Sequence, residues 1–133
     1  MILADTSIWI DYFNGIDSQE TDLLDSALND GTIAMGDLIF LEILQGFRDD
    51  KEFNKAKKTL ATLDQYELFG AHMVDKCAFN YRFLRKKGIT IRKTIGLIIA
   101  TFCLENKIGL LFSDKDYVPF VDFLKLKRYQ SNT

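Results

Sequence analysis

The sequence is poor in several residues that would restrict its class. Its 133 residues include two cysteines, one histidine and one proline. Cys77 and Cys103 both stand in apolar helical stretches, which favours buried, reduced thiols, and nothing in the sequence supports a disulfide between them. No His or Cys has the spacing of zinc ligands. The single proline and scattered glycines exclude a linker or a low-complexity tract.

Long hydrophobic runs are missing as well. No stretch approaches the ~18 uncharged apolar residues of a membrane span, and the first apolar segment contains Asp5 and Asp11. We therefore expect no signal peptide, no membrane partner and a cytoplasmic location. The formal charge of −2 argues against a protein that grips nucleic acid mainly by charge. A nucleic-acid role would need a local basic patch or an enzyme that binds briefly.

What the sequence does contain is enough apolar material for one core. Hydrophobic residues make up 47% of the chain, with eleven Phe, five Tyr and one Trp among its aromatic residues. The length is that of one domain, so we expect a single domain over residues 1–133. Hydrophobic patterning and capping signals predict short strands over residues 2–4, 32–35, 66–69 and 109–112, with a further edge strand over 125–129. They predict helices over 7–13, 20–29, 37–47, 51–63, 74–87 and 93–106, with Ser7 and Asp37 as N-caps of the first and third.

Strands that alternate with helices predict an α/β fold, with helices on both faces of a short, mainly parallel central sheet of four to five strands. In such sheets a ligand binds at the carboxyl ends of the strands. Asp5 follows the first strand, and Asp114 and Asp116 follow the fourth. Glu42 lies in an otherwise apolar helix, where a carboxylate needs solvent or a partner.

Carboxylates that meet in one crevice repel one another unless a cation lies among them, and their hard oxygens suit Mg²⁺ or Mn²⁺. Asp5, Glu42, Asp114 and Asp116 are therefore candidate metal ligands. Each acid alone has an ordinary alternative as a helix cap, a turn residue or a solvated side chain. Both interpretations stay open on the pattern alone.

Four segments of the chain resemble the PIN-domain ribonuclease toxins of the VapC type, from VapBC toxin–antitoxin pairs. They are residues 2–13 (ILADTSIWIDYF), 41–46 (LEILQG), 84–100 (LRKKGITIRKTIGLIIA) and 111–117 (LFSDKDY). The order and spacing of the segments and the total length also fit, so the resemblance covers essentially the whole chain.

The resemblance implies a PIN-like three-layer α/β/α domain and a Mg²⁺-dependent (or Mn²⁺-dependent) endoribonuclease that cleaves tRNA or rRNA through metal-activated water. It implies a cognate antitoxin as partner, a homodimer, and binding of operator DNA only through the antitoxin. Carried over by residue, it makes Asp5, Glu42 and Asp114 the catalytic and metal-binding acids, with Asp116 adjoining them and sharing that role. Ser7 and Ser113 would support the acids through their hydroxyl groups.

One motif departs from the family pattern. The family has an Asp at the start of the helix that we predict over residues 93–106, where this chain has Gly96. Glycine supplies no ligand and costs about 1 kcal/mol relative to alanine inside a helix. One explanation is a natural degenerate member of the family, or a glycine that is tolerated in the first turn of the helix. The other is a substitution that silences a harmful toxin, and we favour this second explanation. Either way we predict weak Mg²⁺ binding and poor cleavage.

Three other functions compete with an active nuclease. The domain could be catalytically silent and bind an antitoxin or RNA. A haloacid-dehalogenase-like phosphatase needs an acid two residues after the first, where this chain has Ser7, and a dinucleotide-binding fold needs a glycine-rich turn that is missing.

The densest basic stretch of the chain includes Arg92 and Lys93. These two residues are either a rim that contacts RNA phosphates or part of a solvated helix face.

Overall fold

The computed structural model describes residues 1–131, and short parallel strands form its centre. Strand β1 (Ile2–Ala4) pairs in parallel with β4 (Gly109–Leu111), and β2 (Met35–Gly36) pairs in parallel with β3 (Gln65–Tyr66). Parallel bridges join Ile2 to Ile33 and Leu110 to Arg128, which extends the sheet on both sides of the β1–β4 pair. The α/β class with a short parallel sheet is confirmed, and the predicted edge strand is reduced to the bridge at Arg128.

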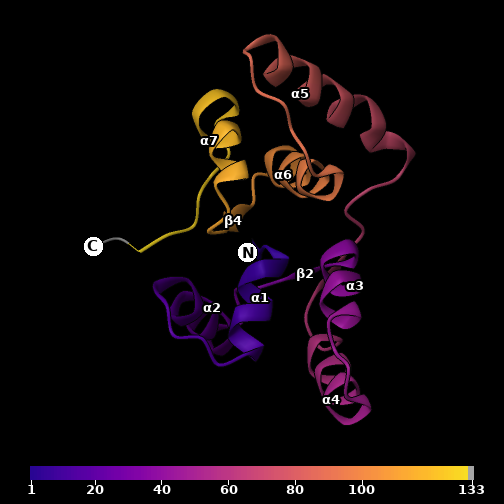
Figure 1. Ribbon diagram of the computed structural model, residues 1–133, viewed down its shortest axis with the longest axis vertical. Coiled ribbons are helices and arrows are strands. Elements are labelled where there is room, and N and C mark those ends of the chain that lie inside the picture. The colour runs from indigo at the N-terminus through magenta and orange to yellow at the C-terminus, as the bar shows by residue number, and fades with distance from the viewer. Residues whose placement is uncertain (132–133) are drawn as a thin grey trace.

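Helices surround these strands (Figure 1). In the view of Figure 1, α1 to α4 lie below the strands and α5 to α7 lie above them. The helices are α1 (Thr6–Phe13), α2 (Gln19–Asp30), α3 (Asp37–Gln45), α4 (Asp50–Leu60), α5 (Val74–Lys86), α6 (Thr94–Asn106) and α7 (Val118–Leu124). Each predicted helix is present, and α7 follows a short 3-10 turn over Lys115–Tyr117.

The core is continuous through the sheet. All three residues of β1 and of β4 are buried, as is Trp9 on α1. Helix α6 is the most enclosed helix, since every residue from Leu97 to Cys103 is buried. A hydrogen bond between Asn80 and Thr101 joins α5 to α6 inside this apolar region. A helix that is hydrophobic all round belongs inside a protein, which matches the apolar sequence of α6.

Two of the predicted helix caps are wrong by one or two residues. The N-cap of α1 is Asp5, whose carbonyl accepts from the amides of Ile8 and Trp9, because the chain leaves β1 at that residue. The predicted cap, Ser7, lies inside the first turn. At α3 the N-cap is Gly36, which ends β2, and the predicted cap Asp37 is the first helical residue. In both places the helix begins within two residues of the end of the strand, so the cap lies earlier in the chain than predicted.

The Asp37 carboxylate instead joins two segments. Its Oδ1 accepts from the amide of Leu38 at 2.8 Å and from the amide of Leu68 at 3.0 Å. Gly36 lies directly against Leu68: a Cβ at position 36 would come within 2.4 Å of the Leu68 side chain. The start of α3 is thus fixed against the segment that follows β3, and this positions the rest of the helix.

Both cysteines are free and buried, as the sequence predicted. Burial raises the pKa of the Cys103 thiol to about 12, so this thiol stays protonated at neutral pH. Among the described residues, no helix has the length and apolar character needed to cross a membrane.

Candidate active site

A pocket of about 460 Å³ opens at the carboxyl ends of β1 and β4. Its polar residues come from four places in the chain: the start of α1, the middle of α3, the start of α6 and the loop after β4. Asp5, Glu42, Asp114 and Asp116 all line it, together with position 96. The convergence expected from the strand ends is therefore present in the structure, although the chemical role of each acid stays a prediction.

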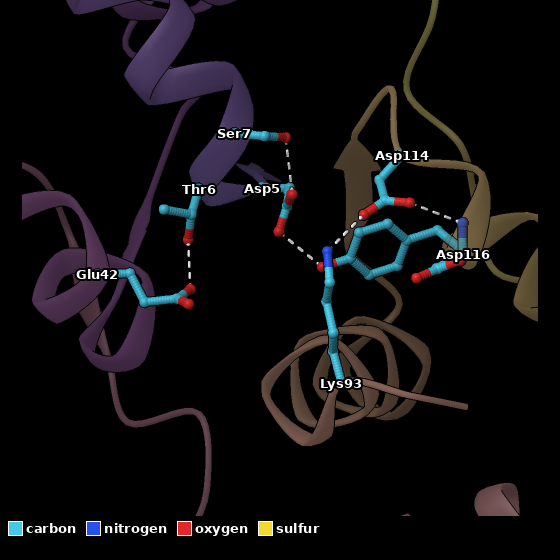
Figure 2. A network of polar contacts seen from close by, with 8 residues as sticks. Asp5, Thr6, Ser7, Glu42, Lys93, Asp114 and Asp116 are labelled. Carbon is cyan, nitrogen blue, oxygen red and sulfur yellow. Dashed lines mark hydrogen bonds and ion pairs between the residues drawn. The ribbon is translucent and has the colours of Figure 1, made fainter. Parts of the chain in front are cut away.

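Asp5 is the buried acid of this group, with 9% of its surface exposed. Its Oδ1 accepts a 2.6 Å hydrogen bond from the hydroxyl of Tyr117, and its Oδ2 accepts one of 2.9 Å from Ser7 (Figure 2). The two hydroxyl groups fix the carboxylate in one orientation at the end of β1. Burial, and then the negative charge of Asp5, raise the pKa of Tyr117, so the tyrosine remains a hydrogen-bond donor.

Asp114 lies across the pocket from Asp5, after β4. Its Oδ1 accepts from the backbone amide of Asp116 at 2.9 Å, so Asp114 also caps the short 3-10 turn. Its Oδ2 forms an ion pair with the ammonium group of Lys93 at 3.2 Å. The Asp116 amide and the Lys93 charge both hold the pKa of Asp114 below its usual value. The Asp116 side chain is exposed at the rim of the same pocket.

Glu42 reaches the pocket from α3 and is tied to α1. Its Oε1 accepts a 2.6 Å hydrogen bond from the hydroxyl of Thr6. In Figure 2 Glu42 and Thr6 lie on one side of Asp5, and Asp114 and Asp116 lie on the other. Because Glu42 is half-buried, the Thr6 hydroxyl supplies the partner that a carboxylate in an apolar helix requires.

The start of α6 forms the remaining wall. Gly96 is in the first turn, and a Cβ there would lie 3.6 Å from the hydroxyl oxygen of Tyr117 and 3.8 Å from the Cβ of Lys93. These are ordinary contact distances, so a side chain at position 96 would fit and would begin beside the residues that hold Asp5 and Asp114. The first-turn glycine therefore faces the pocket rather than the core or the solvent.

The donor chemistry of the pocket suits a hard divalent ion, but the arrangement of the donors does not complete a metal site. Within residues 1–131, no three His, Cys, Asp or Glu residues form a group that could hold a metal ion. The closest cation to Asp114 is the ammonium of Lys93, and both oxygens of Asp5 accept from hydroxyl groups of the protein. As the side chains stand, the acids do not fit Mg²⁺.

The supporting residues differ in part from those predicted. Ser7 contacts Asp5 as expected, whereas Ser113 is exposed and is not among the residues that line the pocket. Lys93 contacts Asp114 and does not stand free on a rim, while Arg92 is exposed beside it. Tyr117 and Thr6 were missed. Their one signal in the sequence is adjacency, because each directly follows an acid of the site, Asp116 or Asp5.

The chain is similar in sequence and in fold to several known proteins. No model of a protein family matches the chain. Curated relatives include the VapC ribonuclease Mb1587 of Mycobacterium bovis and ribonuclease VapC11 of Mycobacterium tuberculosis, each 29% identical over 119 residues, which is 88% of this chain and 89% of the relative. Similar solved structures include VapBC2 from Rickettsia felis bound to a DNA fragment from its promoter, with a TM-score of 0.69, 20% identity and coverage of 99% of this chain and all of that one. A toxin–antitoxin complex from Klebsiella pneumoniae gives a TM-score of 0.65 at 18% identity, covering 98% of this chain and all of that one.

Proposed function

We propose that this chain is the endoribonuclease toxin of a type II toxin–antitoxin pair, impaired because Gly96 replaces the third acid. Its similarity in sequence to VapC ribonucleases and in fold to VapBC complexes supports the proposal. The observation that carries the proposal is the meeting of Asp5, Glu42, Asp114 and position 96 in one pocket, from four separate segments. A purely structural role for each acid would not require them to share a pocket.

The residues of the pocket divide into two kinds. The acids and the hydroxyl groups that orient them form its polar part, where an RNA phosphodiester would react. The apolar lining consists of Ile10, Ile91, Ile95, Ile99 and Phe120. Such a wall suits the base and sugar of a nucleotide beside the scissile phosphate, since pocket walls are mostly apolar with a few placed polar groups. Only the family resemblance suggests that the substrate is tRNA or rRNA.

Dependence on Mg²⁺ or Mn²⁺ is part of the proposal for a site with its full set of acids. In the present arrangement the acids are held by protein donors, so we expect cleavage by the unmodified chain to be slow. Incubation of RNA with a large excess of the chain and Mg²⁺ should give weak cleavage that EDTA stops. Asp5→Asn should reduce this cleavage to background, a change of only a few fold because the starting rate is low. Cleavage that survives in Asp5→Asn would contradict the assigned site.

A second function is favoured by one specific contact. The Lys93–Asp114 ion pair gives the acids a protein cation, which is consistent with a catalytically silent domain that binds an antitoxin or RNA. Restoring the third acid at position 96 and measuring RNA hydrolysis distinguishes the two functions. A silent scaffold gains no hydrolysis from that change, whereas an impaired nuclease does.

An antitoxin partner is part of the proposal. The structural neighbours in VapBC complexes support it, and the surface offers exposed apolar side chains on two helices that also contribute to the pocket. Ile10 and Phe13 on α1 and Leu41 on α3 are exposed by 39%, 36% and 51%, and α1 packs against α3. Large apolar side chains that remain exposed on packed neighbouring helices are typical of a protein-binding surface. The proposals that the chain forms a homodimer and that it binds operator DNA through the antitoxin rest on the family resemblance.

The proposed RNA-contacting rim is tested at Arg92, because Lys93 already forms an ion pair with Asp114. We expect Arg92→Glu to weaken RNA binding and to lower the slope of log K against log salt by about 1, as for the loss of one phosphate contact. Lys86→Glu is the matched control, since Lys86 is an equally charged, exposed residue on α5 outside the pocket lining. Fluorescence anisotropy in EDTA at several salt concentrations measures both variants. Equal affinity of the two would refute the rim.

A further inference from the structure

Lys93 is placed inside the electrostatic field of several pocket acids. Its ammonium nitrogen lies 3.2 Å from Oδ2 of Asp114, and the side chain is otherwise largely exposed. The pKa of Lys93 is raised first by its hydrogen bond to Asp114 and by that residue's charge, with further contributions from the charges of Asp116 and Asp5. In Figure 2 the Lys93 side chain rises from the start of α6 toward the space between Asp5 and Asp114.

Gly96 explains why this space is open to a lysine. Lys93 is the N-cap of α6, and Gly96 follows in the first turn. A Cβ at position 96 would lie 3.8 Å from the Cβ of Lys93 and 3.6 Å from the hydroxyl of Tyr117, so a side chain there would extend between these two donors. With glycine at 96, that position has no side chain to compete with Lys93 and Tyr117 for the acids.

The two donors each use one carboxylate oxygen of an acid that lines the pocket. Tyr117 donates to Oδ1 of Asp5, and Lys93 donates to Oδ2 of Asp114. Neighbouring carboxylates need a compensating positive charge, and a divalent ion or an ammonium group can provide it. The lysine is covalently attached and always present at the site, whereas a metal ion must displace it from Asp114 in order to bind.

We propose that Lys93 is an internal cation that takes the place of a divalent metal at Asp114 and thereby sets the metal affinity of this site. Lys93 is thus a residue that determines which cation the acids hold. The inference rests on the proposed nuclease site, but it concerns cation binding and needs no RNA. It assigns Lys93 a place in the pocket itself rather than on an RNA-contacting rim.

The test is binding of Mn²⁺ to the full chain, measured by calorimetry or by the electron paramagnetic resonance signal of free Mn²⁺. We expect Lys93→Gln to bind Mn²⁺ about tenfold more tightly than the unmodified chain, the size of effect that groups around metal ligands commonly have. Lys93→Arg keeps the positive charge and should stay as weak as the unmodified chain.

A matched control exists between α5 and the other end of α6. Lys76 forms an ion pair with Glu105, also at 3.2 Å, and neither residue lines the pocket. Lys76→Gln removes one positive charge and one ion pair of the same length, so it should change Mn²⁺ affinity less than twofold if the effect of Lys93 is local. A gain in Lys76→Gln equal to that in Lys93→Gln would mean that net charge alone is responsible, and would overturn the inference.

The other outcomes are also decisive. Equal Mn²⁺ affinity in the unmodified chain, Lys93→Gln and Lys93→Arg overturns the inference, and so does a lack of measurable binding in all three. Neither result touches the proposed ribonuclease function, which is judged by RNA cleavage after an acid is restored at position 96. Conversely, a failure of that restored variant to cleave RNA leaves the Mn²⁺ comparison of the Lys93 variants intact.

Discussion

Gly96→Asp is expected to cleave RNA in the presence of Mg²⁺ at least about tenfold faster than the unmodified chain, and to arrest growth when it is expressed. The change restores a carboxylate that begins beside Tyr117 and Lys93 and points into the pocket with Asp5 and Asp114. A third acid supplies one more ligand for the metal and competes with Asp114 for Lys93. Metal affinity and activity commonly respond to such changes by roughly 10–100-fold.

The fold should accept this substitution without loss of stability. The nearest atoms to a new Cβ are at 3.6 Å, so no neighbour has to move. Aspartate in the first turn of α6 also interacts favourably with the helix dipole, and it avoids the conformational cost of glycine. With Mg²⁺ present to offset the repulsion between the acids, the thermal unfolding temperature of Gly96→Asp should therefore equal or exceed that of the unmodified chain.

Two variants make the activity test specific. Gly96→Asn has nearly the same shape as Gly96→Asp but carries no charge, and should remain as slow as the unmodified chain. Asp5→Asn combined with Gly96→Asp should lose the gained activity, because the acid at the end of β1 is removed. Cleavage rates of RNA with Mg²⁺, and with EDTA as a blank, measure all four proteins. Equal rates for Gly96→Asp and Gly96→Asn would show that the third-acid assignment is wrong.

A large loss of stability from the addition of a single methyl group is expected at Gly36. Gly36→Ala should lower the free energy of unfolding by roughly 1–3 kcal/mol, the usual cost of overpacking a core. The added methyl group would lie 2.4–2.7 Å from three carbon atoms of the Leu68 side chain, and Leu68 is fully buried, so it has nowhere to move. Urea unfolding followed by circular dichroism measures the change.

Gly46 offers the matched control at the other end of α3. Its backbone is helical, with φ of −78°, and its nearest neighbour to a new Cβ is a carbonyl oxygen at 3.4 Å, so Gly46→Ala should be neutral or slightly stabilising. Leu68→Ala alone should cost about 2–5 kcal/mol. Combined with Gly36→Ala it should cost less than the sum, because the new methyl group fills part of the cavity. Equal unfolding midpoints for Gly36→Ala and Gly46→Ala would contradict the packing described at β2.

The sequence predicted the order of strands and helices well because each element carries a local signal. Hydrophobic spacing and glycine stops lie within the segments themselves. The cap positions were wrong where a strand enters a helix directly, as at Asp5 and Gly36, because the change in backbone direction there is set by the sheet. Strands β2 and β3 are shorter than the sequence predicted for the same reason. The length of a strand depends on its pairing with neighbouring strands, and β2 and β3 have few such neighbours.

The site was partly predictable. Asp5 and Asp114 could be placed together because the carboxyl ends of parallel strands meet at one edge of a sheet. The donors that hold these acids could not, since Tyr117 is 112 residues from its partner Asp5 and the sequence contains no signal for that contact. Lys93 was a candidate for the rim because it stands in the densest basic stretch just before the third-acid position, whereas its actual contact comes from the loop after β4.

The enclosure of α6 has a consequence for how such a site can change over time. Because the seven residues from Leu97 to Cys103 are covered on all sides, the helix is anchored along its length and its exposed first turn has little freedom to shift. A new side chain at position 96 therefore meets the same surroundings whatever its chemistry. The buried residues of α6 stabilise the fold, and position 96 affects the reactivity of the pocket. A change of a single codon at position 96 can therefore alter reactivity while the fold is preserved.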